Sequence, residues 1–87
     1  MEYFVVIDQI DKSMLGMAQT LEECADLFLK EFPRVADYIG KLGKKHGVDS
    51  ANSYLVQHFQ DDLNHMGLAL SASRAIPVTV WRCIIND

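Results

Sequence analysis

The chain has 87 residues, of which 49% are hydrophobic and 23% are charged, and twelve acidic residues against eight basic ones give a formal net charge of −4. A chain of this length predicts a single domain that buries only about 60–65% of the surface exposed when it is unfolded. The excess of acidic residues argues against general nucleic-acid binding, because contacts to phosphates require clustered Lys and Arg side chains.

The start of the chain shows no sign of export. Glu2 precedes an apolar stretch that begins at Tyr3, without the basic segment that opens a secretory signal. No apolar run approaches the roughly 18 residues that are needed to cross a bilayer. Two cysteines, Cys24 and Cys83, are too few for a disulfide framework, so we expect both to be reduced core residues. These features together predict a cytoplasmic protein that does not bind membranes.

Strands are predicted at the two ends of the chain. Residues 3–10 and 14–18 are apolar and flank Asp11-Lys12-Ser13, a short polar break that is typical of a β-hairpin. A last strand is predicted at residues 77–86, after a loop at residues 68–75.

Three helices are predicted between the hairpin and the last strand. The first begins at Leu21, because Thr20 and Glu23 have the spacing of a capping box. The chain then breaks at Pro33, which lacks an amide proton and suits the first turn of a second helix. The third helix is expected over residues 51–66. The resulting order β-β-α-α-α-β predicts one α+β domain over the whole chain, with a small antiparallel or mixed three-stranded sheet and helices packed on one face.

The first and last strands are apolar on both of their faces. Phe4 and Val6 share one face of the first strand, and Trp81 and Ile85 share one face of the last strand. Helices on one side of the sheet leave its second side uncovered. An uncovered face that carries Phe4, Val6, Trp81 and Ile85 would form an apolar patch of several hundred Å², which soluble monomers rarely expose.

Two arrangements remain open for this patch. In one, a strand is central and enclosed by the third helix and the loop, so that no patch exists. In the other, a second copy or a different protein covers the patch, and two-fold dimers are the commonest oligomers. The main prediction is a non-catalytic protein-binding module that self-associates as a homodimer through an apolar sheet surface formed by Phe4, Val6, Trp81 and Ile85.

Two further functions are compatible with the sequence. The small size, the acidity and the lack of motifs fit an accessory or inhibitor protein of a mobile element or phage that binds a host assembly. Alternatively, the third helix places four possible metal ligands on one face, at spacings of three, four and seven residues: His58, Asp61, Asp62 and His65.

The simpler interpretation of these four possible ligands is that they form the solvated face of the third helix, opposite its apolar residues. A small ligand would instead need a pocket between sheet and helices, lined by Phe28, Tyr38 and Phe59. We identify neither a nucleophile with an oriented base nor an oxyanion hole, so we expect no enzyme and no cofactor.

Overall fold

The computed structural model describes residues 1–64 and 76–84 and confirms the predicted α+β fold. The last residues of the predicted third helix and the predicted loop lie outside the described residues. The elements follow in the order β1 (Glu2–Asp8), β2 (Met14–Ala18), α1 (Leu21–Glu31), the 3-10 turn η1 (Pro33–Val35), α2 (Ala36–Lys45), α3 (Ala51–Asn64) and β3 (Val78–Ile84).

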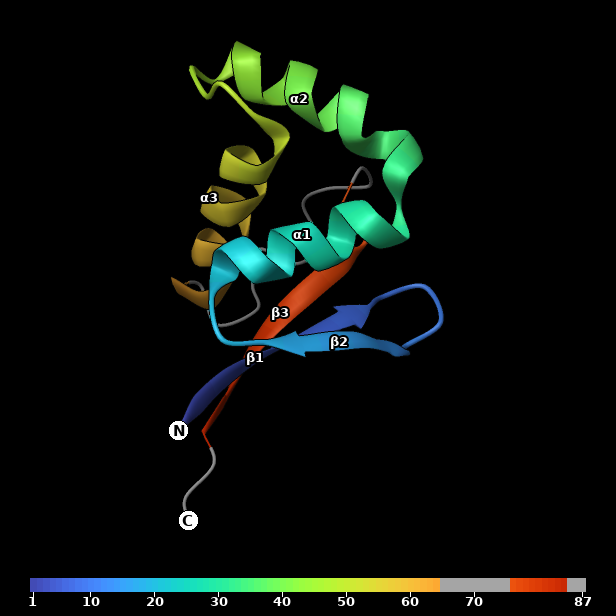
Figure 1. The fold of residues 1–87 in the computed structure, drawn as a ribbon, viewed down its shortest axis with the longest axis vertical. Helices are drawn as coiled ribbons and strands as arrows, with labels where there is room; N and C mark the ends of the chain where they lie inside the picture. Colours follow the sequence, from blue (N-terminus) through green and yellow to red (C-terminus); the bar gives the residue numbers. More distant parts are fainter. Residues whose placement is uncertain (65–75, 85–87) are drawn as a thin grey trace.

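The three strands form one antiparallel sheet in the order β2-β1-β3, so the first strand of the chain lies in the centre. The hairpin between β1 and β2 is present as predicted, and the Asp8 backbone N–H donates to the Ser13 carbonyl oxygen across its turn at 2.8 Å. The register pairs Val6 with Gly16 on one side and with Val80 on the other. Figure 1 shows β1 and β3 side by side although they come from opposite ends of the chain.

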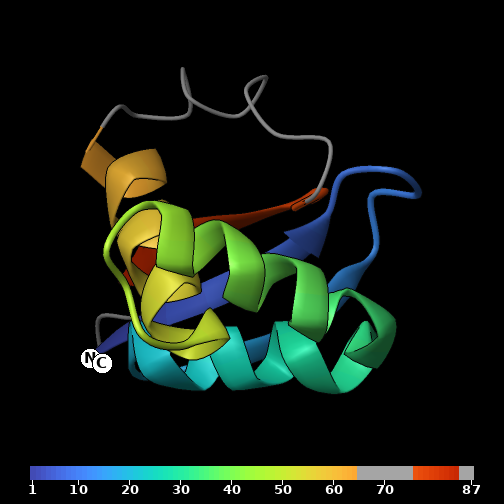
Figure 2. The ribbon, with the colours of Figure 1, turned by 90° about the horizontal axis from the view of Figure 1, so that it is seen from above.

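The two ends of α1 lie at a capping residue and just before a proline. Thr20 Oγ1 accepts a hydrogen bond from the Glu23 backbone N–H at 3.1 Å, which satisfies one unpaired donor in the first turn of α1. α1 ends before Pro33, and η1 turns the chain into α2. Figures 1 and 2 show all three helices on the same side of the sheet.

The core lies between the helices and one face of the sheet. Val6 is fully buried in the centre of this face, and the buried residues of α1 have the three-and-four spacing of one helical face. The members of the core come from the sheet, from every helix and from the residues just before β3: Val6, Ala18, Val78 and Val80 from the strands, Leu21, Cys24, Ala25 and Phe28 from α1, Ile39 from α2, Leu55 and Phe59 from α3, and Ile76.

The two glycines of α2 have different surroundings. A Cβ atom at Gly40 would meet nothing within 4 Å, whereas a Cβ atom at Gly43 would lie 3.3 Å from Tyr54 Cβ and 3.3 Å from the Val48 carbonyl oxygen. The absence of a side chain at Gly43 therefore allows α2 to approach the start of α3 closely.

This difference predicts opposite outcomes for two alanine substitutions. Gly40→Ala is expected to raise the free energy of unfolding by about 0.5–1 kcal/mol, because alanine has the higher helix propensity. Gly43→Ala receives the same contribution but crowds backbone atoms, so it is expected to be neutral or destabilising. Urea unfolding of both variants checks this, and an equal stabilisation in both would contradict the close approach at Gly43.

Candidate functional site

The sheet face opposite the helices carries only uncharged side chains along its three described strands. Two rows of neighbouring residues cross the whole sheet on this side: Met17, Val5 and Trp81 form one, and Met14, Ile7 and Thr79 form the other. Tyr3 and Cys83 form a further pair. We call this set of residues the open face: Tyr3, Val5, Ile7, Met14, Met17, Thr79, Trp81 and Cys83.

Large apolar side chains of the open face are exposed to solvent. The exposed fraction is 51% for Trp81, 47% for Met17 and 58% for Met14. Val5 and Ile7 lie between these residues in β1 and are partly exposed. Val6, the next residue in the sequence, points to the helices and is 0% exposed. Within residues 1–64 and 76–84, the pleat of β1 thus separates a face packed against the helices from an apolar face with exposed side chains.

The indole of Trp81 has its polar atom bonded within the chain. Trp81 Nε1 donates to Thr79 Oγ1 at 2.9 Å, and Gln9 Nε2 donates to the same oxygen at 2.7 Å. Thr79 is only 2% exposed, so these bonds are shielded from water. The exposed half of the indole therefore presents carbon atoms, and a partner could cover it without leaving a buried N–H unpaired.

The four residues predicted as an interface do not share one face. Phe4 packs against the core and Val6 is fully buried there, whereas Trp81 lies on the opposite face of the sheet. The prediction that Phe4 and Val6 accompany Trp81 is wrong, because the register pairs Trp81 with Val5. Ile85 lies outside the described residues.

The polar set predicted on the third helix is divided between the interior and the surface. Asp62 is 2% exposed, and its Oδ2 atom lies 3.6 Å from Nε2 of the half-buried His58, whereas Asp61 is exposed. The prediction of a common solvated face is therefore wrong for Asp62. His65 lies outside the described residues. Within residues 1–64 and 76–84, no group of three or more His, Cys, Asp or Glu side chains could hold a metal ion.

The three aromatic residues predicted to line a ligand pocket lie apart in the fold. Phe28 and Phe59 are fully buried members of the core, whereas Tyr38 on α2 is 54% exposed. Phe28 packs against Phe32, with 5.2 Å between the ring centroids. Phe28 and Phe59 therefore stabilise the fold, and the three residues do not surround a common pocket.

The two cysteines differ in setting. Cys24 is fully buried on α1, and burial, together with the nearby carboxylates of Glu23 and Glu22, raises the pKa of its thiol to about 11. Cys24 is therefore protonated near neutral pH, whereas a nucleophilic cysteine must be a thiolate. Cys83 belongs to the partly exposed open face and not to the core, which corrects the prediction for this residue. Neither thiol forms a disulfide in the structure.

The described helices include none that is both long enough and apolar enough to span a membrane. No family model, curated protein or solved structure matches the chain.

Proposed function

We propose that the protein is a binding module that associates with a second copy of itself through the open face. The observation that carries this proposal is the half-exposed indole of Trp81, which lies beside Val5 and has its N–H already bonded to Thr79. Tryptophan residues in such positions are frequent anchors of protein interfaces, because they provide a large contact area at a low cost in conformational entropy.

The chemistry of the open face suits contact with an identical face. Two copies can meet without burying an ionised group, whose desolvation would cost several kcal/mol. Two sheets that stack face to face lie about 10 Å apart and allow their side chains to interdigitate. A two-fold axis would place Trp81 of each copy against the open face of the other.

The size of the face predicts a weak contact. Two strands of seven residues and one of five, about 4.8 Å apart at about 3.3 Å per residue, give a face of roughly 300 Å². This is less than half of the roughly 800 Å² that each partner contributes to an interface of standard size. We therefore expect a dissociation constant on the order of 10–1000 μM for this contact alone.

Replacing Trp81 by threonine tests the proposal. Threonine keeps a β-branched side chain in β3 but removes the exposed indole, so the fold should persist. At a concentration where the wild-type chain is associated, the average mass of Trp81→Thr in sedimentation equilibrium is expected to fall to about half of the wild-type value.

Tyr38 offers a matched control, since its exposed fraction of 54% is close to the 51% of Trp81, but it lies on α2. Tyr38→Gln is expected to keep the mass of the wild-type chain. Equal masses for Trp81→Thr and the wild-type chain, with helix content unchanged, would show that the open face does not mediate self-association.

A further inference from the structure

β2 is an edge strand that carries neither charged residues nor proline. It lies at the outside of the sheet and consists of Met14-Leu15-Gly16-Met17-Ala18. Charged residues and proline are two common means by which an exposed edge avoids pairing with another strand, and a short strand and a β-bulge are two others. β2 has no charged residue and no proline, but it is only five residues long and has a register shift opposite Val6 and Ile7. Its outer backbone groups can nevertheless accept a further antiparallel strand.

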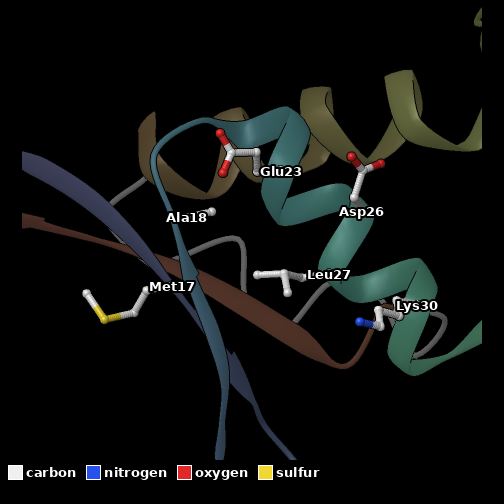
Figure 3. Close-up of a pocket in the computed structure, with 6 residues that line it drawn as sticks. All are labelled: Met17, Ala18, Glu23, Asp26, Leu27 and Lys30. Carbon is white, nitrogen blue, oxygen red and sulfur yellow. The ribbon is translucent and has the colours of Figure 1, made fainter.

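α1 lies alongside this edge and packs closely on the middle of β2. A Cβ atom at Gly16 would be only 3.0 Å from Leu27 Cδ1, so the midpoint of the strand lies directly under Leu27. A hollow of about 240 Å³ opens between the strand and the helix (Figure 3). Its lining comes from the end of β2 and from one side of α1: Met17, Ala18, Glu23, Asp26, Leu27 and Lys30.

The charges along this side of α1 have a fixed order. Glu23 and Asp26 precede Leu27, and Lys30 follows it by one turn of the helix. Among the described residues, neither Glu23 nor Lys30 forms an ion pair within the chain. An acidic end, an apolar centre and a basic end form a pattern that complements itself when a second copy is placed antiparallel to the first.

We propose that β2 pairs antiparallel with β2 of a second copy, about a two-fold axis that passes beside Gly16. The middle of β2 and the middle of the Glu23–Lys30 segment lie next to each other, because Leu27 packs on Gly16. One axis therefore aligns both elements. It joins two three-stranded sheets into one of six strands. It also brings Leu27 of each copy into the contact between the two copies, and places Glu23 opposite Lys30 of the second copy.

This edge contact does not require Trp81, because it uses the backbone of β2 and side chains of α1, although Met17 belongs both to the open face and to the lining of the hollow. The two contacts are also compatible with each other. Joining two sheets at their edges doubles the open face to roughly 600 Å², which approaches the roughly 800 Å² that one partner contributes to a standard interface. Four copies could then form two six-stranded sheets stacked face to face.

A charge exchange in the Trp81→Thr chain tests the edge contact with the proposed face contact removed. At low ionic strength, Trp81→Thr is expected to dimerise with increasing concentration in sedimentation experiments. Adding Glu23→Lys or Lys30→Glu replaces two attractive pairs by two repulsive ones, so each variant is expected to dimerise at least tenfold more weakly. A mixture of the two variants restores both attractive pairs, and is expected to form heterodimers within about threefold of the parent affinity.

Glu22→Lys provides the control, because Glu22 is the neighbouring acidic residue on α1 but does not line the hollow at β2. This variant should dimerise as the parent does. Hydrogen exchange provides a second measurement: the backbone amides of residues 14–18 should exchange more slowly as the parent dimerises, and not in the Lys30→Glu variant. A parent chain that stays monomeric, or a mixture that is no better than its two components, would overturn the edge pairing. Neither result depends on whether Trp81 mediates the face contact.

Discussion

The Val6→Lys variant is expected to be unfolded at room temperature, whereas Val5→Lys is expected to fold and to lose self-association through the open face. The two residues are neighbours in β1 and differ in the face to which they point. Val6 is 0% exposed and lies in the core, while Val5 lies between Met17 and Trp81 on the open face. The same substitution therefore tests both faces of one strand.

The expected free-energy costs of Val6→Lys and Val5→Lys explain why the first variant should unfold and the second should not. A lysine at position 6 buries an ammonium group without a partner, at a cost of several kcal/mol, while a domain of this size has a total stability of about 5–10 kcal/mol. A lysine at position 5 can extend its charged end into water, which limits the cost in the monomer to about 1 kcal/mol. In a face-to-face dimer, however, it would place two like charges in the centre of the contact.

Circular dichroism and sedimentation of the two variants check this prediction. We expect helical signal and a monomeric or edge-paired mass for Val5→Lys, and loss of the signal for Val6→Lys. An unfolded Val5→Lys together with a folded Val6→Lys would show that the two faces of β1 have been assigned the wrong way round.

Phe28→Ala is expected to lower the free energy of unfolding by about 3–5 kcal/mol, which is the usual cost of removing a buried aromatic ring. Phe28 is fully buried in the core on α1, and its ring packs against Phe32. In a domain that buries only about 60–65% of its surface, this loss is a large part of the total stability.

Leu29 on the same helix provides a comparison, because it is only partly buried. Leu29→Ala is expected to lower the free energy of unfolding by about 1–2 kcal/mol. Urea unfolding measures both values, with the slope of each transition used to check that two-state behaviour is retained. Similar losses for Phe28→Ala and Leu29→Ala would be inconsistent with a core centred on Phe28.

Much of the fold could be predicted from the sequence because its signals are local. The Thr20 cap, the break at Pro33 and the three-and-four spacing of apolar residues in α1 each depend on residues within one or two turns. The polar break after β1 likewise predicted a hairpin. These features determine the elements and their order, and the order in turn determines the fold class.

The composition of the open face could not be predicted in the same way. Alternation within β1 and β3 is readable from sequence, but both faces of each strand are apolar, so the pattern does not tell which faces coincide. That information lies in the register, which pairs Val5 and not Val6 with Trp81. Met17 was missed for the same reason, since it joins the open face only through its pairing with β1.

The polar residues of α3 show a second limit of sequence analysis. A spacing of four residues predicts that His58 and Asp62 are neighbours, and the structure brings them within 3.6 Å. The sequence does not reveal that the neighbouring elements bury Asp62, because a carboxylate normally marks the solvated side of a helix. Tertiary packing here overrides the simple division of the helix into polar and apolar faces.

The fluorescence of Trp81 during dilution tests the central claim most directly, because Trp81 is the only tryptophan in the chain and lies on the open face. Emission would be recorded from about 1 mM to about 1 μM protein, a range that spans the expected dissociation constants. We predict a blue-shifted maximum in the concentrated sample and a shift to longer wavelength on dilution, as the indole passes from the interface into water. An emission maximum that stays constant over this range, while sedimentation shows the protein to be associated, would contradict self-association through the open face.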